Sequence, residues 1–214
     1  MFDNLLYYSA LLITVMAFIS SLRSFRLDYS KNLKFFSILL GVTAFNEVGA
    51  WFIPAVLHQK NIDWYNIFMG IEFLMYGYFY YLIIELKIVK TVIRVYLWVF
   101  PVFWYTVVFF VFGIKSWNSY LAIAGSLSVV CFSLFYYYQL VAFAPQKKQF
   151  GSSAEFWIVT GLLVFYSCNM PYIGMLNFLV KNYLTLAHKI IVSFQVMYIL
   201  TYGLFIYAFS RRQF

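Results

Sequence analysis

Seven runs of mostly apolar residues, each about 20 residues or longer, account for most of this sequence. A helix of about 20 apolar residues is long enough to cross the ~30 Å hydrocarbon core of a bilayer. The connections between the runs are short, so no folded domain is expected outside the membrane. The sequence therefore predicts an all-α, polytopic membrane protein: a single seven-transmembrane-helix domain over residues 1–214, with spans at about 4–22, 35–57, 64–86, 95–113, 119–143, 157–178 and 190–209.

The overall composition excludes the main soluble classes. Apolar residues are 64% of the chain and charged residues are 10%, whereas soluble domains average about 45–50% and about 25%. A soluble fold of this size could not cover so much apolar surface. We therefore exclude a soluble enzyme, a disordered chain and a nucleic-acid-binding domain, and we expect the lipid bilayer to be the principal partner.

Basic residues at the ends of the runs predict the orientation of the chain, because cytoplasmic loops are enriched in Lys and Arg. The asymmetry places the N-terminus outside and the C-terminus inside, in what we expect to be a bacterial cytoplasmic (inner) membrane. The net charge of +8 is then a signal of topology rather than of nucleic-acid binding. Eleven basic residues mark the inner ends and four the outer ends: Arg23, Arg26, Lys31, Lys34, Lys87, Lys90, Arg94, Lys147, Lys148, Arg211 and Arg212, against Lys60, Lys115, Lys181 and Lys189.

Two carboxylic acids lie deep inside the predicted spans, whereas Glu85 falls at the inner end of the third span. Ionisable residues deep inside a span are costly and indicate functional sites. Glu47 is ten residues from Leu57, and Glu72 is eight residues from Trp64. At 1.5 Å per residue both lie about 12–15 Å from the outer ends of their spans. Amide side chains occur at comparable depths in other spans. We predict a layer in the outer half that binds a ligand or a proton, formed by Glu47, Glu72, Asn46, Asn66, Asn169 and Gln195.

The chemistry of this layer follows from its charge. No basic residue lies at the same depth as Glu47 or Glu72, and a buried charge without a counter-charge is costly. The pair could therefore share one proton, bind a cationic small molecule or relay protons. The alternative is that both residues are neutral and only fix helix contacts through hydrogen bonds.

The groups needed by seven-helix pigments and enzymes are missing from the predicted spans. The seventh span has no lysine for a retinal Schiff base, and the two histidines, His58 and His188, fall in outer loops rather than in a zinc-binding cluster. Ser126 has no intramembrane histidine to activate it. Cys131 and Cys168 are expected to be buried apolar side chains without a disulfide. We predict no cofactor and no metal, and a protein that is not an enzyme, although a carboxylate pair leaves a lipid-modifying enzyme open.

The span directions also permit a 3+1+3 duplication, in which spans one to three and five to seven are parallel repeats. An offset of 120 residues aligns Phe45 with Phe165, and an offset of 123 aligns Glu72 with Gln195. The dipeptide Pro145–Gln146 after the fifth span is similar to the motif of PQ-loop transporters, but it occurs only once. A repeat is therefore possible but weakly marked.

The stretch from Phe156 to Ser167 reads Phe-Trp-Ile-Val-Thr-Gly-Leu-Leu-Val-Phe-Tyr-Ser. It resembles small heptahelical membrane proteins of Bacteroidota, as do the chain length and the seven-span layout with the N-terminus outside. Such proteins are often encoded beside sensor histidine kinases, so the resemblance implies a sensory role. It contains no catalytic motif and implies a role for no individual residue.

Three functions are compatible with these observations. The first is a sensory or receptor-like module, which binds a small ligand or a proton in the outer-half polar layer and signals to a cytoplasmic or membrane partner protein. The second is a small-solute transporter of 3+1+3 design, similar to the sugar-efflux and PQ-loop transporters, with proton-coupled carboxylates. The third is an accessory membrane subunit without a ligand, in which the polar layer serves only packing.

Overall fold

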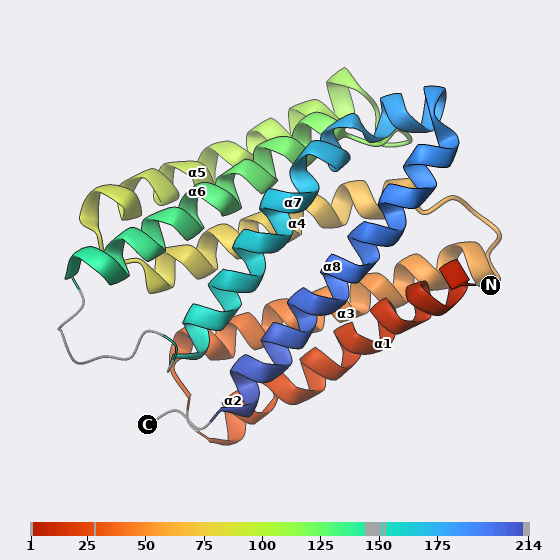
Figure 1. Ribbon diagram of the computed structural model, residues 1–214. Helices are drawn as coiled ribbons and strands as arrows, with labels where there is room; N and C mark the ends of the chain where they lie inside the picture. Colours follow the sequence, from red (N-terminus) through yellow and green to blue (C-terminus); the bar gives the residue numbers. More distant parts are fainter. Residues whose placement is uncertain (1, 28, 144–150, 152, 212–214) are drawn as a thin grey trace.

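The computed structural model describes residues 2–27, 29–143, 151 and 153–211. Every regular element in these ranges is a helix (Figure 1), so the prediction of an all-α chain is confirmed. The possible PQ-loop motif, Pro145–Gln146, lies outside the described residues. The same is true of three basic residues that bear on the predicted orientation: Lys147, Lys148 and Arg212.

The helices follow the predicted apolar runs closely. Two short elements accompany the long helices: α2 (Arg23–Arg26) follows the first, and η1 (Val107–Val111) is a π-helical segment that continues the fourth. Within the described ranges the long helices are α1 (Phe2–Ser21), α3 (Lys31–Val56), α4 (Ile62–Ile83), α5 (Lys87–Thr106), α6 (Ser119–Phe143), α7 (Ala154–Asn182) and α8 (Leu184–Ser210).

Local signals account for several helix ends. At the start of α7, the Ser153 hydroxyl accepts a hydrogen bond from the Phe156 backbone N–H (3.2 Å), as an N-cap residue does. Gly113, with φ 77°, takes the left-handed conformation that ends the η1 segment. His58 lies in the loop between α3 and α4, as expected, whereas His188 belongs to the early turns of α8 rather than to a loop.

Six of the helices are long and apolar enough to cross a membrane, in agreement with a multi-pass membrane protein: α1, α3, α5, α6, α7 and α8. The remaining long helix, α4, contains Asp63, Asn66 and Glu72 among otherwise apolar and aromatic residues. It is nevertheless 22 residues long. This helix is also one of the two that carry the predicted carboxylic acids.

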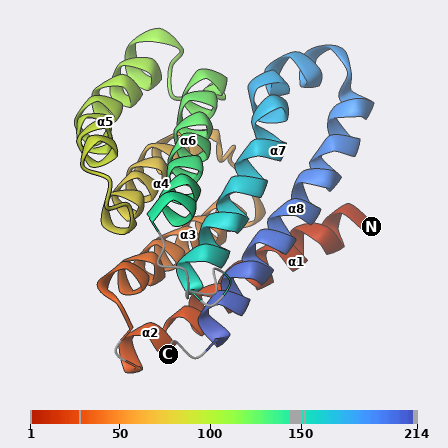
Figure 2. The same ribbon diagram turned by 60° about the vertical axis from the view of Figure 1, so that its left-hand side comes forward.

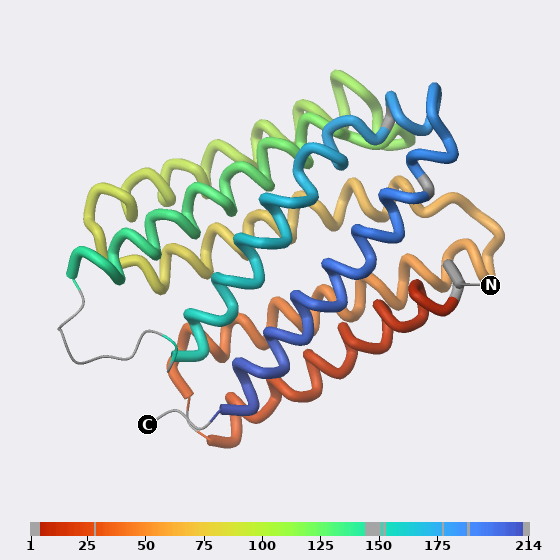
Figure 3. Tube along the Cα trace, viewed as in Figure 1, coloured from red at the N-terminus to blue at the C-terminus, as the bar shows by residue number. Residues whose placement is uncertain are grey.

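The helices are arranged as a closed ring of six with one helix outside it (Figures 1 and 2). Around the ring, α1 packs against α3, α3 against α4, α4 against α6, α6 against α7, α7 against α8, and α8 against α1. The outer helix, α5, packs chiefly against α4. The Cα trace in Figure 3 follows the same course. Gly125 permits the close approach of α6 to α4, because a Cβ atom there would overlap the ring of Phe73.

The two ends of the bundle differ in their interiors. We call the end where α1 begins the N-terminal end and the end where α8 finishes the C-terminal end (Figure 1). Toward the C-terminal end the interior is filled by four fully buried rings from α3, α4 and α8. The ring of Phe36 contacts those of Phe79, Phe205 and Phe209, with centroids 4.9, 5.2 and 6.4 Å away. We refer to these four side chains as the aromatic plug.

The outer surface of the bundle is largely apolar, as a lipid-facing surface must be. Ile88, Trp98 and Val141 are among its most exposed side chains. The expectation that Cys131 and Cys168 are buried is wrong: both thiols are free and exposed on this surface. Both lie near the middle of apolar helices, but the sequence could not indicate which side of each helix faces inward.

Candidate functional site

A cavity of about 440 Å³ lies inside the helix ring, in the half nearer the N-terminal end. Its volume falls within the ~300–1,000 Å³ typical of small-molecule sites. All six ring helices line it and α5 does not. The polar lining includes Thr43, Asn46, Glu47, Glu72, Ser126 and Gln195, and the aromatic lining includes Tyr7, Tyr65, Phe68, Phe73, Trp117, Phe165, Tyr166, Tyr172, Phe194 and Tyr198.

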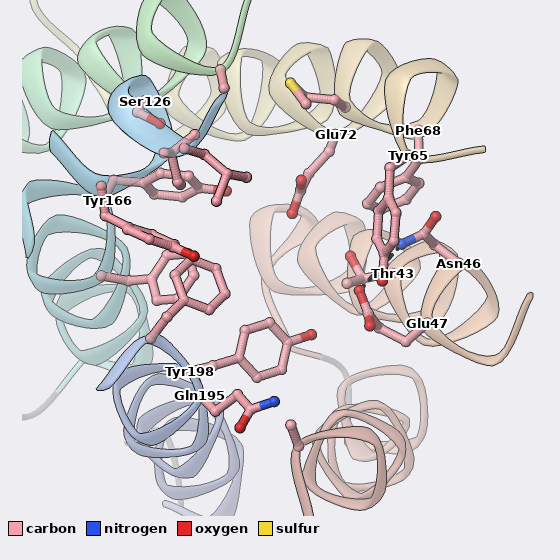
Figure 4. Close-up of a pocket in the computed structure, with 18 of the residues that line it drawn as sticks. Thr43, Asn46, Glu47, Tyr65, Phe68, Glu72, Ser126, Tyr166, Gln195 and Tyr198 are labelled. Atoms are coloured by element: carbon pink, nitrogen blue, oxygen red, sulfur yellow. Dashed lines mark hydrogen bonds between the residues drawn. The ribbon is translucent and has the colours of Figure 1, made fainter. Parts of the chain in front are cut away.

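The two carboxylic acids face this cavity from adjacent helices (Figure 4). Glu47 comes from α3 and Glu72 from α4, and both are half-buried because their carboxyl groups reach the cavity. The indole Nε1 of Trp64 on α4 donates to the Asn46 carbonyl oxygen on α3 (3.2 Å), a bond that sets the register of the two helices. The Asn46 side chain in turn donates from Nδ2 to Glu47 Oε1 (3.2 Å).

The surroundings of the acid pair carry no compensating positive charge. No lysine, arginine or histidine is among the described residues that line the cavity. The two carboxyl groups are close enough for a direct Coulomb interaction with each other. Two negative charges that face the same cavity repel each other, so the described lining is poorly suited to holding both acids in ionised form. A cation or a proton entering the cavity would remove this repulsion.

Tyrosines surround the acid pair on the remaining sides. The Tyr76 hydroxyl donates to Glu72 Oε1 (3.2 Å). The ring of Tyr166 packs edge-on against Tyr76, with centroids 5.7 Å apart, and its hydroxyl also interacts with Glu72. Tyr198 and Gln195, both on α8, lie on the opposite wall from Glu47 (Figure 4). The carboxyl groups therefore meet phenol rings and hydroxyls rather than a counter-charge.

Several buried polar atoms of the lining have no hydrogen-bond partner within the described structure. They are Asn46 Oδ1, Ser126 Oγ, the Tyr172 hydroxyl and Gln195 Oε1. Buried polar groups are nearly always paired in folded proteins, because an unpaired group costs about 1–3 kcal/mol. A cluster of unpaired acceptors and hydroxyls around one cavity is the pattern expected where a bound molecule supplies the missing partners.

Four of the six predicted site residues thus come together at the cavity: Glu47, Glu72, Asn46 and Gln195. Asn66 does not line it. Its side-chain Nδ2 donates to the backbone carbonyl oxygens of Ile114 and Ser116, both at 2.7 Å. The backbone carbonyl oxygen of Asn66 accepts from Trp104 Nε1 (2.9 Å). Asn66 therefore ties α4 to α5 and to the loop before α6.

Asn169 is the other predicted residue that stays outside the lining. It is buried on α7 and donates from Nδ2 to the Phe165 carbonyl oxygen one turn earlier, at 2.8 Å. Tyr172 and Ile173, a few residues further along α7, do line the cavity.

A continuous series of ring contacts leads from the cavity to the aromatic plug. Tyr198 lines the cavity and stacks on Tyr202, with centroids 4.4 Å apart. Tyr202 contacts Phe205 at 5.2 Å, and Phe205 contacts Phe36 at 5.2 Å. The plug is therefore connected to one wall of the cavity by direct contacts between rings.

The two residue pairs aligned by the possible duplication differ in whether their members share an environment. Glu72 and Gln195 both line the cavity. Phe45 and Phe165 do not share an environment: Phe45 is 70% exposed on the outer surface, whereas Phe165 is 9% exposed and lines the cavity. The 120-residue register therefore finds no support in the burial of this pair.

Sequence reasoning missed the aromatic part of the site. Tyr7, Tyr65, Tyr166 and Tyr198 face the acids, yet nothing distinguishes them in the sequence from the many tyrosines at membrane interfaces. Ser126 was considered only as a nucleophile. Helical spacing could have indicated Tyr65 alone, because Tyr65 precedes Glu72 by two turns on the same helix.

Comparison of the chain with protein families, with curated proteins and with solved structures found no match. Within the described residues, no group of three or more His, Cys, Asp or Glu side chains is placed to hold a metal ion. The function is therefore argued from the cavity itself.

Proposed function

We propose that this chain is a sensory or receptor-like module of a bacterial cytoplasmic membrane. In this proposal α4 crosses the membrane together with the six more apolar helices, the N-terminal end faces outward and the C-terminal end faces the cytoplasm. A small ligand or a proton enters the cavity from outside and contacts Glu47, Glu72, Asn46 and Gln195. The occupied cavity favours a different packing of the helices, which a partner protein detects at the cytoplasmic end.

The observation that carries this proposal is an asymmetric cavity inside the ring, next to a packed interior. Both carboxylic acids come from α3 and α4, and the facing helices α7 and α8 contribute no acid to the lining. Below the cavity the aromatic plug fills the ring with fully buried side chains. A cavity with acids on two helices only, and with the plug filling the ring on its C-terminal side, suits ligand detection better than passage of a solute.

The ring contacts supply a physical route for the signal. A ligand that displaces Tyr198 acts on Tyr202, then on Phe205 and the rest of the plug. Close-packed interiors tend to switch between discrete arrangements rather than deform gradually. We therefore expect the plug to have two packing arrangements, and we expect the ligand to favour one of them.

The cytoplasmic end offers a surface for a partner. Basic residues gather there at the ends of several helices, among them Arg23, Arg26, Lys31, Lys87 and Arg94. An acidic surface on a signalling protein, such as a histidine kinase, would complement them. The short connections of the chain leave any output to such a partner.

Purification from native membranes in a mild detergent, followed by native mass spectrometry, tests this proposal. We expect an intact particle that holds a signalling protein in fixed stoichiometry. As a control, substituting Arg23, Arg26 and Arg94 with glutamine should release the partner and leave the helical spectrum unchanged. A particle with neither a partner nor a small molecule, under conditions that retain other membrane complexes, would contradict the proposal and favour an accessory subunit.

A transporter of 3+1+3 design is the second candidate, and the helix arrangement favours it. The peripheral position of α5 is the one expected of a linker between two three-helix repeats. The contacts of α4 with α6 and of α8 with α1 are equivalent under such a repeat. Counterflow of a labelled solute in proteoliposomes, abolished by Glu72→Gln but not by Glu85→Gln, would favour the transporter over the receptor.

A further inference from the structure

The cavity combines three features that together select one class of ligand. The first is charge: two carboxylic acids face the same space, and no basic side chain is among the described lining residues. An anionic ligand would meet only repulsion, and a neutral ligand would leave the acids uncompensated. A cationic ligand would neutralise them in surroundings where the effective dielectric constant is low.

The second feature is the aromatic surface around the acids. Aromatic rings make up ten of the 23 lining side chains. The faces of Tyr and Trp rings attract organic ammonium groups through cation–π interactions worth about 0.5–2 kcal/mol each. Tyr65 and Tyr7 lie near Glu47, and Tyr166 lies near Glu72. Within the described residues, no three His, Cys, Asp or Glu side chains lie close enough together to hold a metal ion.

The third feature is the set of unpaired acceptors. Asn46 is 1% exposed, yet its Oδ1 has no partner in the described structure, and the same holds for Gln195 Oε1 on the opposite wall. Ser126 is fully buried on α6 with an unpaired hydroxyl. A ligand whose N–H groups reach these oxygens would supply the hydrogen bonds that they lack.

We propose that the cavity binds an organic cation: a small molecule with an ammonium group and an apolar, preferably aromatic, body. The ammonium group lies between Glu47 and Glu72, and the apolar body lies against the rings of α7 and α8, such as Phe165 and Phe194. This inference rests on the proposed function, because it names the class of ligand that the receptor-like module detects.

Three probes with the same phenyl ring and chain but different charge test the inference: 2-phenylethylammonium, 2-phenylethanol and 3-phenylpropionate. Their binding to the purified full-length protein is measured at neutral pH by calorimetry and by thermal stabilisation. We expect the ammonium ion to bind about tenfold more tightly than the alcohol, which corresponds to ~1.4 kcal/mol. We expect no measurable binding of the carboxylate.

Variants assign this preference to the acids. The double variant Glu47→Gln/Glu72→Gln should lose the preference for the ammonium ion and keep its affinity for the alcohol, which also shows that the cavity remains folded. Glu85→Gln makes the same chemical change on an exposed residue outside the cavity and should leave all three affinities unchanged. If the double variant does not fold, the two single variants should each weaken ammonium binding.

The other outcomes separate the inference from the proposed function. Equal binding of the alcohol and the ammonium ion, or an ammonium affinity unaffected in the double variant, would overturn the organic cation while keeping a ligand-binding module. If no probe binds but thermal stability responds to pH through Glu47 and Glu72, the ligand is a proton and the organic cation is again overturned. If neither probes nor pH act through the acids, both the inference and the proposed function fail.

Discussion

Two serines on α6, Ser126 and Ser133, illustrate how hydrogen bonding differs between the two halves of the bundle. They lie seven residues apart, so they share a face of the helix, and both are fully buried. Ser133 in the C-terminal half bonds to the Tyr80 hydroxyl at 2.5 Å and to the Val129 carbonyl oxygen at 2.8 Å. Ser126 in the N-terminal half borders the cavity, and its hydroxyl has no partner in the described structure.

This contrast indicates that one set of helices serves two purposes. In the C-terminal half the polar groups are paired, and aromatic rings fill the interior. In the N-terminal half several polar groups around the cavity have no partner within the described residues. Stability is therefore expected to come mainly from the plug half, and ligand recognition from the cavity half.

The largest effect should follow from opening the plug. Phe36→Ala should lower the free energy of unfolding by about 3 kcal/mol, at the lower end of the ~3–5 kcal/mol seen in soluble proteins, because lipid rather than water surrounds the separated helices. Phe45→Ala, at a 70% exposed site on the same helix, is the matched control and should cost less than about 1 kcal/mol. Unfolding in mixed micelles measures both, and similar losses would contradict the division into two halves.

A smaller loss is expected from the anchor at Asn66. Asn66→Ala removes two hydrogen bonds of 2.7 Å and leaves the Ile114 carbonyl oxygen without this partner, while the Ser116 carbonyl oxygen keeps its bond from Asn118 Nδ2. The loss should be about 2 kcal/mol. Asn46→Ala removes only the single bond from Asn46 Nδ2 to Glu47 Oε1 and should cost less. If Asn46→Ala cost more stability than Asn66→Ala in the same unfolding assay, the structural role assigned to Asn66 would be wrong.

The serine pair should differ by an amount that is modest but measurable. Ser133→Ala leaves the Tyr80 hydroxyl without its partner and should cost about 1 kcal/mol. Ser126→Ala should change stability by less than about 0.5 kcal/mol, because no hydrogen bond is lost. Parallel unfolding curves at one pH give the comparison. An equal loss in both variants would mean that Ser126 is paired within the folded protein.

The smallest effect on stability at fixed pH is expected at the acids. Glu47→Gln and Glu72→Gln preserve side-chain shape and remove a charge that nothing in the described lining compensates. The midpoint of thermal unfolding should change little at neutral pH, but its dependence on pH between about 5 and 8 should be flatter than in the parent protein. Glu85→Gln serves as the control. An unchanged pH response in both cavity variants would exclude the acids as the responsive groups.

The location of the site was predictable only in part. Counting residues from the ends of the apolar runs put Glu47, Glu72, Asn46 and Gln195 at similar depths, and the structure brings these four to one cavity. The same count put Asn66 with them, although its side chain points to the loop before α6 instead. Depth is a one-dimensional quantity, whereas pairing depends on the rotation of each helix about its axis.

What the sequence determined by itself is the helical content and the extent of each long helix, because the length of an apolar run limits what can cross a bilayer. The tertiary structure alone decided which side of each helix faces the ring. It placed Cys131 and Cys168 on the lipid-facing surface, grouped unremarkable tyrosines around the acids and left α5 outside. In a chain this uniformly apolar, hydrophobicity does not distinguish interior from lipid, so close packing and hydrogen bonding between helices decide the orientation.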